Sequence, residues 1–313
     1  MERICRNILE AIGNTPLVKI QRLTGVDEAS IIAKVESLNP GGSIKSRPAL
    51  AMIEAAERDG HLKPDSIIVE PTSGNQGIGL AMVCAVKGYQ AKIVMPDSVS
   101  MERRKLLENY GAEVILIKDN GNIGETIEKC VQTALQMAKS DSRIFVPQQF
   151  ENPNNPRIHR ETTVQEVLQQ FDGTIDAFCA GIGTGGTLTG IGEILKEKYP
   201  GIIIVAVEPV KGAILSGGLI GSHLQQGIGD GIIPPVLNQS IIDEIITVTD
   251  EQALSTARRL AKEEGLMVGI SSGTNVWAAM QLAKRLGEGK TVLTVLPDSA
   301  ERYFSTELFK PEE

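Results

Sequence analysis

Short apolar runs rich in Val and Ile alternate with amphipathic stretches along most of the chain. Runs of this kind are typical of strands buried in a sheet. The amphipathic stretches place apolar residues three or four positions apart, as in helices that cover a sheet, and several of them end at a glycine. Strands and helices in this alternating order predict an α/β fold, in which helices flank a mostly parallel sheet.

The predicted elements fall into two groups. The first has strands at 31–35, 67–69, 91–95 and 114–117 and helices at 50–59, 77–87, 101–110 and 126–138. The second has strands at 177–180, 202–207 and 291–296 and helices that end near 198 or span 254–264 and 277–286. Between the groups, the Asn- and Pro-rich segment 150–156 is the best candidate for a boundary or hinge. We therefore expect two domains, at 1–150 and 151–313.

Composition narrows the class of protein. The 313 residues suffice for two domains with their own cores, and a hydrophobic fraction of 42% excludes a disordered chain. The net charge of −8 argues against nucleic acid as the main partner, because phosphate binding needs clustered Lys and Arg. No apolar run reaches the roughly 18 residues of a membrane span, and no signal peptide is visible. The four scattered cysteines lack metal-ligand spacing, so we expect no metal and a reducing cytoplasm.

Glycines are concentrated in the run GIGTGGT at 181–187, between a predicted strand and a predicted helix. Glycines let a backbone approach an anion closely, and a helix N-terminus offers free N–H groups and a partial positive charge. The spacing also matches the GxGxxG pattern of NAD-dependent enzymes, with Glu208 about 20 residues later at the end of the next strand. The pattern thus leaves a phosphate site, a dinucleotide site and a plain tight turn open.

Lys45 follows a Gly-Gly turn and stands at the expected start of a helix, in the run NPGGSIKSR at 39–47. A positive charge is unfavourable at a helix N-terminus. The position is better explained by a lysine that is neutral or covalently engaged, and desolvated lysines form Schiff bases with carbonyl compounds. The alternative is a surface lysine on a loop.

Two further turns precede predicted helices. The run PTSGNQG at 71–77 offers backbone N–H groups and hydroxyls that suit a carboxylate, and the Asn75 amide can hydrogen-bond a phenolic oxygen. The run GISSG at 269–273 offers serine hydroxyls. In both runs the alternative is a side chain that only caps its helix.

Taken together, these motifs resemble the cysteine synthase (O-acetylserine sulfhydrylase) family of pyridoxal-phosphate enzymes, with its tryptophan-synthase-β-like fold (fold type II). The resemblance runs nearly end to end, over 13–18, 33–36, 39–47, 70–80, 148–153, 183–190, 208–209, 215–218, 226–229, 269–273 and 297–299. It implies two domains, each a mostly parallel sheet flanked by helices, the second being the larger and binding the cofactor. We expect residues 14–36 to pack on that second domain. An NAD-dependent enzyme becomes a remote alternative.

The resemblance implies a role for each matching residue. Lys45 would carry pyridoxal phosphate and act as the catalytic base, and Asn75 would contact the 3′ oxygen of the cofactor. The other expected cofactor contacts are a phosphate loop and a serine at the pyridine nitrogen: Gly183, Thr184, Gly185, Gly186, Thr187 and Ser271. The expected substrate contacts are Thr72, Ser73, Gln149, Gly227 and the backbone of Gln76.

By the same resemblance, the reaction is β-replacement on a β-substituted L-alanine. O-acetyl-L-serine and sulfide would give L-cysteine and acetate through an aminoacrylate. The alternatives are a cystathionine β-synthase-type condensation with homocysteine and a cysteine desulfhydrase that releases sulfide. The family implies a homodimer, and the C-terminal tail of serine acetyltransferase is a candidate partner.

Several positions depart from the family pattern. Ser46 replaces the usual Asp, Gln76 replaces Thr beside the carboxylate, and Asp230 stands where cysteine synthases have Ala. We expect Asp230 either to point outward into solvent or to lie over the active site. In the second case its carboxylate would repel hydrosulfide, and it could act as a base toward water or a larger thiol or bind an amino group. Our hypothesis is that Asp230 contacts substrate and shifts the preference for acceptor or leaving group.

Overall fold

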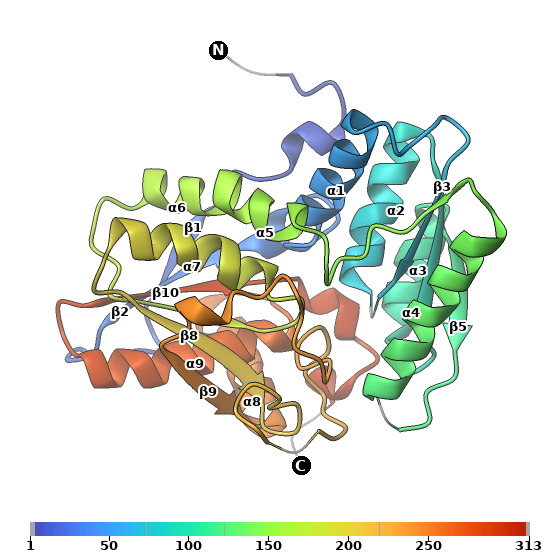
Figure 1. Cartoon of the computed structure of the whole chain (residues 1–313). Helices are drawn as coiled ribbons and strands as arrows, with labels where there is room; N and C mark the ends of the chain where they lie inside the picture. The colour runs from blue at the N-terminus through green and yellow to red at the C-terminus, as the bar shows by residue number, and fades with distance from the viewer. Residues whose placement is uncertain (1–3, 73, 122, 219, 311–313) are drawn as a thin grey trace.

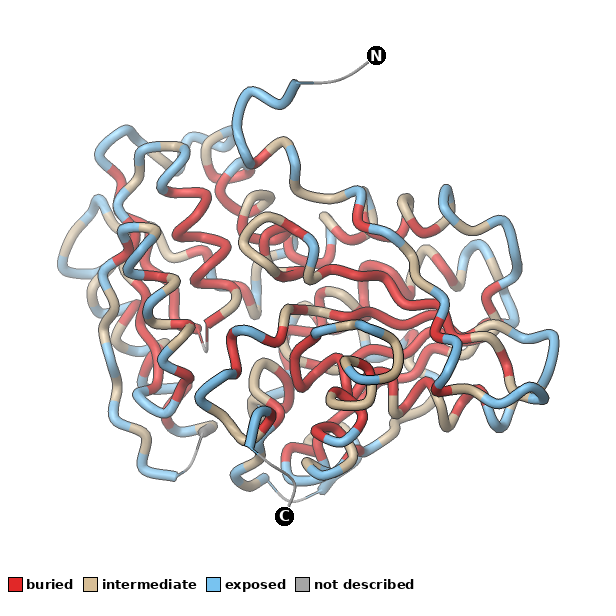
Figure 2. The backbone as a smooth tube through the Cα atoms, turned by 180° about the vertical axis from the view of Figure 1, so that it is seen from behind, coloured by how far each residue is buried: buried red, intermediate tan, exposed pale blue. Residues whose placement is uncertain are grey.

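The computed structural model describes residues 4–72, 74–121, 123–218 and 220–310. Two sheets organise these residues, and helices cover both faces of each sheet (Figure 1). Buried residues gather along the strands and on the inner sides of the helices, whereas the connecting loops are exposed (Figure 2). The predicted α/β fold is confirmed.

The larger sheet has the strand order β1-β2-β10-β7-β8-β9. Its strands are β1 (Leu17–Ile20), β2 (Ser30–Val35), β7 (Ala177–Gly181), β8 (Ile203–Pro209), β9 (Glu244–Val248) and β10 (Thr291–Leu296). Strands β1 and β2 pair antiparallel, and the other neighbours pair parallel. The larger sheet therefore combines two strands from the beginning of the chain with four from its second half.

Helices bury their apolar faces on both sides of this sheet. On one face lie α8 (Asp250–Glu264) and α9 (Ile270–Leu286), and on the other lie α6 (Val164–Gln170) and α7 (Gly186–Lys198). The sequence defines both ends of α8. A capping box between Thr249 and Gln252 begins the helix, and Gly265 ends it in the left-handed conformation that glycine adopts freely.

The smaller sheet is parallel, with the order β5-β4-β3-β6. Its strands are β3 (Ile67–Pro71), β4 (Gln90–Pro96), β5 (Glu113–Ile117) and β6 (Ile144–Phe145). On one face lie α1 (Ser46–Arg58), α2 (Asn75–Lys87) and α3 (Met101–Asn109), and on the other lies α4 (Ile123–Ser140). The two sheets thus form separate cores.

The chain passes from the smaller to the larger sheet through the Asn- and Pro-rich segment. Helix α5 (Asn154–Ile158) begins inside this segment and is followed by a π-helical turn, η3 (His159–Thr163). Helix α5 packs against α1 on one side and α7 on the other. The segment is therefore packed between elements of both groups, and the domain boundary at 150 stays a prediction.

Five helices begin earlier than predicted: α1, α2, α4, α8 and α9. Helix α1 starts at Ser46 instead of 50, because Pro48 is tolerated in a first turn, where its missing N–H has no helical partner to lose. Helix α9 starts at Ile270 instead of 277. Its first turn is rich in Ser and Gly, and Gly273 lies so close to α8 that a Cβ would be 2.0 Å from the carbonyl oxygen of Ala253.

Candidate active site

A cavity lies between the two sheets, at the carboxyl ends of their strands. Residues after β3 line one wall, and residues that end or follow β7 and β10 line the other. The cavity contains about 870 Å³ of space, open water at its mouth included. Most of the predicted site residues line it: Lys45, Thr72, Asn75, Gln76, Gln149, Gly183, Thr184, Gly185, Thr187, Gly227, Asp230 and Ser271. Ligands of open parallel sheets typically bind at this edge.

Lys45 is the N-cap residue of α1, so its amine enters the cavity at the positive end of a helix. Its Nζ donates a hydrogen bond to Thr184 Oγ1 at 3.5 Å. Burial lowers the pKa of this amine to about 8, although the negative charge of Asp230 acts in the opposite direction. An appreciable fraction of the amine is therefore neutral and nucleophilic near neutral pH.

The glycine-rich turn after β7 forms a narrow backbone cradle. Gly185 is the N-cap of α7, with a φ of 79° that favours glycine, and Gly186 is the buried first residue of the helix. At Gly183 a Cβ would lie 2.4 Å from the carbonyl oxygen of Gly227. A side chain at Gly185 would strain the backbone, and a side chain at Gly183 would fill the cradle. The free N–H groups at the start of α7 suit an anion.

Two buried residues support this turn from behind. Asn155 Nδ2 donates to Thr184 Oγ1 at 2.9 Å and to the Gln149 carbonyl at 2.8 Å. His159 Nε2 lies 3.4 Å from Thr187 Oγ1. Burial, with the nearby charges of Arg47 and Lys45, holds the pKa of His159 well below its usual value, so the imidazole is neutral. His159 therefore contacts Thr187, a residue predicted to bind the cofactor, and does not itself line the cavity.

Asn75 and Ser271 reach the cavity from the first turns of α2 and α9. The Nδ2 of Asn75 donates to Asp298 Oδ2 at 2.6 Å, and the Tyr303 hydroxyl donates to the same oxygen at 2.7 Å. Asp298 follows β10 and is fully buried. The position of the Asn75 amide is thus set by a residue of the opposite wall.

The predicted carboxylate-binding residues form the wall beside β3. Thr72 Oγ1 accepts a hydrogen bond from Gly74 N at 3.1 Å, and Ser73 lies outside the described residues. The backbone N–H of Gln149 donates to Glu70 Oε1 at 2.9 Å. Burial raises the pKa of Glu70 to about 7, although backbone N–H groups at Gln148 and Gln149 oppose the shift. Gln76 is almost fully buried and lines the same wall.

Asp230 lies in the long Gly-rich segment at 212–235, which contributes to the cavity wall. It is half-buried and lines the cavity, so it lies at the site, and its contact with substrate stays a prediction. Burial raises the pKa of its carboxyl group, and the charges of His223 and Lys45 act in the opposite direction. A carboxylate and the Lys45 amine therefore influence each other across the cavity.

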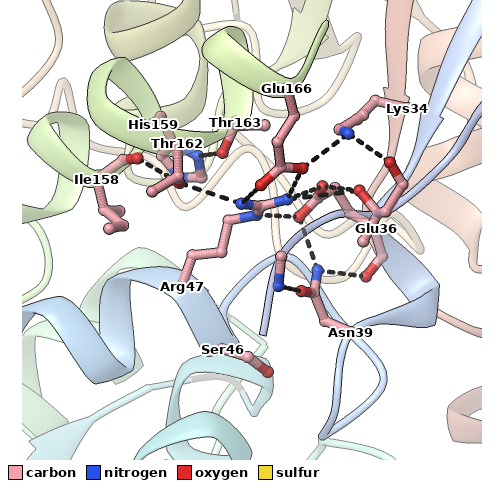
Figure 3. Close-up of polar contacts among 12 residues, drawn as sticks. Lys34, Glu36, Asn39, Ser46, Arg47, Ile158, His159, Thr162, Thr163 and Glu166 are labelled. Carbon is pink, nitrogen blue, oxygen red and sulfur yellow. Dashed lines mark hydrogen bonds and ion pairs between the residues drawn. The ribbon is translucent and has the colours of Figure 1, made fainter. Parts of the chain in front are cut away.

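Behind the cavity, a group of buried charges holds the first turn of α1 (Figure 3). This group, called the Arg47 cluster below, consists of Lys34, Glu36, Arg47 and Glu166. Glu36 binds the Arg47 guanidinium with both oxygens, at 2.7 and 2.8 Å, and Glu166 does the same at 2.6 and 2.7 Å. Lys34 Nζ lies 2.8 Å from Glu166.

The Arg47 cluster ties α1 to the larger sheet and to α6, because Lys34 lies on β2 and Glu166 on α6. Burial opposes ionisation of Glu166, but the hydrogen bonds and charges of Arg47 and Lys34 lower its pKa to about 2. Arg47 is two residues from Lys45, so this cluster fixes the helix that positions the amine. Sequence reasoning missed it, since buried ion pairs leave no periodic signal.

Glu208, the acidic residue that would bind the ribose of a dinucleotide, is hydrogen-bonded to the protein itself. Its carboxylate accepts hydrogen bonds from Leu215 N at 2.8 Å and from the backbone and hydroxyl of Ser216 at 3.2 and 3.1 Å. In the dinucleotide pattern this acid would be free to bind a ligand hydroxyl. The GxGxxG spacing therefore reflects a tight strand-to-helix turn without a dinucleotide site.

A comparison with protein families matches residues 8–298 to the family described as pyridoxal-phosphate dependent enzyme. A cysteine synthase of Staphylococcus aureus is 54% identical over 304 residues, which cover 97% of this chain and 96% of that protein. Nearly the whole length of both chains is therefore shared.

Solved structures also match. A hydrogen sulfide-producing enzyme from Fusobacterium nucleatum superposes with a TM-score of 0.91 at 42% identity, covering 96% of this chain and all of the other. An O-acetylserine dependent cystathionine beta-synthase from Helicobacter pylori superposes with a TM-score of 0.93 at 38% identity, covering 99% of this chain and 100% of that chain. The same fold is thus shared by enzymes that are named for different reactions.

Proposed function

The chain belongs to the family of pyridoxal-phosphate-dependent enzymes, and on this premise we propose that it catalyses β-replacement on O-acetyl-L-serine, with sulfide as acceptor and L-cysteine as product. The observation that carries the proposal is the buried Lys45 amine, whose pKa is lowered to about 8 beside the glycine cradle of α7. An amine of this kind can form a Schiff base and exchange protons at neutral pH.

The residues of the cavity fit pyridoxal phosphate. The cradle at Gly183 leaves no room for a side chain, and the N–H groups at the start of α7 suit the phosphate. We assign the phosphate contacts to the loop 183–187, the 3′ oxygen to Asn75 and the pyridine nitrogen to Ser271. When bound, the cofactor supplies an electron-withdrawing ring that acidifies the α-carbon of the substrate.

Lys45 would be the proton carrier of the reaction. In our proposal its amine takes the α-proton from the substrate, the acetate leaves from the β-carbon, and the same amine returns the proton after sulfide has added there. General base catalysis is most efficient when the pKa of the base lies near the working pH, which the lowered pKa of Lys45 supports.

The wall beside β3 would hold the α-carboxylate of the substrate. Thr72, Gln149 and the backbone N–H of Gln76 are proposed as the donors. Glu70 would position Gln149 through the hydrogen bond to its backbone. At the pyridine nitrogen, the neutral hydroxyl of Ser271 stabilises a positive charge less than a carboxylate would, which favours prompt loss of the leaving group over side reactions at the α-carbon.

The proposal is tested by mixing the yellow, cofactor-loaded protein with O-acetylserine, O-phosphoserine, serine and cysteine in turn. We expect O-acetylserine to produce the largest change in cofactor absorbance, and sulfide to reverse that change with formation of cysteine. A protein that stays colourless after reconstitution, or that responds to none of the four, would disprove the proposal.

A second candidate function follows from the Asp230 carboxylate. A negative charge in the cavity wall disfavours hydrosulfide and can accept a proton from water or from an amino-acid thiol. Release of sulfide from cysteine, or condensation with homocysteine, would then compete with cysteine formation. Product analysis with cysteine alone, and with O-acetylserine plus homocysteine, distinguishes these reactions.

We also propose that the enzyme is a homodimer. A large groove is lined by both polar and apolar residues, and its apolar residues include Leu38, which is 63% exposed, and Met267, which is 47% exposed. Apolar side chains at this exposure are typical of a surface that a second copy covers. Light scattering of the wild type and of Met267→Asp tests the assignment, since the variant should shift the mass toward the monomer.

The remaining partner and compartment assignments are also proposals. The C-terminal tail of serine acetyltransferase would bind in the cavity as a competitor of the amino acid, which a titration with that peptide tests. All four cysteines carry free thiols, which favours a reducing cytoplasm. None of the described helices is long and apolar enough to cross a lipid bilayer.

A further inference from the structure

Asp298 is a fully buried acid that links the two walls of the cavity. Its Oδ2 accepts hydrogen bonds from Asn75 Nδ2 at 2.6 Å and from the Tyr303 hydroxyl at 2.7 Å. Its Oδ1 lies against the start of α9, where a Cβ on Gly269 would be 2.0 Å away, and has no hydrogen-bond partner among the described residues. Burying a carboxylate with one oxygen unmet is costly, so the position needs an explanation beyond the stability of the fold.

The contacts of Asn75 fix which way its amide faces. Nδ2 donates to the Asp298 carboxylate, and on the other side Oδ1 accepts from Arg302 Nη1 at 3.5 Å. A carboxylate only accepts and a guanidinium only donates, so the reverse orientation would place the amide oxygen against the carboxylate and the amide nitrogen against the cation. The amide is therefore held one way round. One Nδ2–H is used by Asp298, which leaves the other for a ligand in the cavity that Asn75 lines.

Two further residues hold the Asp298 carboxylate in place. Arg103 lies on α3, and its Nη2 donates to the Tyr303 hydroxyl at 2.7 Å and lies 3.7 Å from Asp298 Oδ2. Burial raises the pKa of Tyr303, so its phenol stays protonated and donates to Asp298. Of the two hydrogen-bond donors to Asp298 Oδ2 given above, Asn75 lines the cavity and Tyr303 does not. The carboxylate therefore acts on the cavity through Asn75.

We propose that Asp298 is a positioning residue for cofactor binding, which turns the Asn75 amide so that its second Nδ2–H donates to the 3′ oxygen of pyridoxal phosphate. This inference rests on the proposed function and deepens it, because the assignment of the 3′ oxygen to Asn75 leaves open what orients the amide. Asp298 excludes the flipped amide, in which Oδ1 would take the place of the donor. The unmet Oδ1 of Asp298 is then a cost in stability that the fold retains for the sake of the site.

The test measures how much the 3′ oxygen contributes to cofactor binding. The apoprotein of the full chain is titrated with pyridoxal phosphate and with 3-deoxypyridoxal phosphate, an analogue that lacks this oxygen. The factor by which the dissociation constant of the analogue exceeds that of pyridoxal phosphate is called the 3′ preference below. Asn75→Ala sets the baseline, because its methyl group cannot hydrogen-bond the oxygen. We expect the 3′ preference of the wild type to exceed this baseline about tenfold, as for one hydrogen bond.

Two variants of Asp298 test the role of its carboxylate. In Asp298→Ala the Asn75 amide loses the acceptor that orients it, so the 3′ preference should fall to within about twofold of the baseline. Asp298→Asn keeps the shape and an amide oxygen that can accept from Asn75, but it can also present its own nitrogen. We therefore expect an intermediate 3′ preference, about threefold above the baseline.

Tyr303→Phe is the matched control. It removes the other donor to the same carboxylate oxygen and leaves the hydrogen bond between Asn75 and Asp298 in place. The thermal midpoint should fall, because the buried partners of the hydroxyl are left unmet. The 3′ preference should stay within about twofold of the wild type, which separates a loss of stability from a loss of amide orientation.

Several outcomes overturn the inference. A wild-type 3′ preference in Asp298→Ala would show that Asp298 acts on the fold alone, even if both dissociation constants rose, and the same result in Asp298→Asn decides the matter if Asp298→Ala does not fold. An equal loss of preference in Tyr303→Phe would assign the effect to the network as a whole.

The proposed function fails separately. A wild type whose 3′ preference equals that of Asn75→Ala would remove the contact between Asn75 and the 3′ oxygen, and the inference with it, while cofactor binding itself stands. A wild type that binds neither compound would disprove the proposed function, whatever the variants do.

Discussion

The Arg47 cluster and the cavity are two buried polar regions that lie on opposite sides of the first turn of α1. In the cluster, two cations and two carboxylates are paired with one another at distances of 2.6 to 2.8 Å. In the cavity, the Lys45 amine has one hydroxyl contact at 3.5 Å, and both amide atoms of Gln76 have no partner among the described residues. Lys45 and Arg47 are only two positions apart in the sequence.

The difference shows how neighbouring charges acquire different roles. Burying a charge is costly unless it is paired, so the Arg47 cluster stabilises the fold only as a complete set. In the cavity, burial lowers the pKa of the Lys45 amine, and both amide atoms of Gln76 lack a hydrogen-bond partner among the described residues. Stability and chemistry are therefore divided between the two sides of one helix turn.

The largest expected effect separates two buried lysines, Lys45 in the cavity and Lys34 in the Arg47 cluster. Lys45→Ala should lower the rate of β-replacement by a factor of about 10³ or more, because the base and the Schiff-base amine are both lost. It should leave the urea midpoint nearly unchanged. Steady-state rates, cofactor absorbance and urea unfolding measure these quantities.

Lys34→Met is the control and should give the reverse pattern. Its loss leaves Glu166 with one cation fewer, so the urea midpoint should fall while the yellow cofactor absorbance is retained. If Lys34→Met lost the yellow colour and Lys45→Ala kept it, the two regions would have exchanged roles.

The next effect concerns stability alone. Arg47→Met leaves the Glu36 and Glu166 carboxylates without their guanidinium, and we expect the free energy of unfolding to fall by about 3–5 kcal/mol. Arg143→Met is the control, because that arginine pairs with Asp141 at 2.6 Å on the surface with a side chain 53% exposed. Its loss should leave the free energy of unfolding nearly unchanged, because the pair is exposed to solvent. Equal losses in the two variants would contradict a special role for the cluster.

The sequence predicted the cavity better than the cluster. The glycine run before α7 and the turn before α2 predict backbone sites for an anion, because glycines and hydroxyl residues follow predicted strands there. The pairing of Arg47 with Glu166 joins residues that are 119 positions apart and depends on tertiary structure alone. The unmet amide of Gln76 was equally hidden, since the sequence does not tell which polar groups find partners.

The sequence analysis also failed to predict strand β9 and helix α5, and both failures have physical reasons. Strand β9 (Glu244–Val248) lies at the sheet edge with mostly half-buried residues, so its apolar pattern is weak. Helix α5 contains Pro156 and begins in an Asn-rich stretch that propensity assigns to a loop, yet Asn155 and Pro156 are buried by packing against α1 and α7. At α5, tertiary contacts therefore outweighed local preference.

A smaller effect tests whether the charge of Asp230 selects the acceptor. In Asp230→Ala we expect the rate with sulfide, relative to the rate with homocysteine or water, to rise about fivefold, which corresponds to about 1 kcal/mol of repulsion. Rates with each acceptor at fixed O-acetylserine provide the ratio. An unchanged ratio would remove Asp230 from acceptor selection and leave it as a wall residue of the cavity.

The smallest effect is a shift in pH dependence. Only the neutral Lys45 amine attacks the aldehyde, so the rate at which apoprotein takes up pyridoxal phosphate should rise with pH through a midpoint near 8. The charge of Asp230 raises the pKa of Lys45, so Asp230→Asn, which keeps the shape but removes the charge, should move the midpoint to lower pH. The midpoint should not move in Arg143→Met, whose charge lies on the surface. An unchanged midpoint in Asp230→Asn would mean that the two groups do not interact across the cavity, and Asp230 would then have no part in setting the pKa of Lys45.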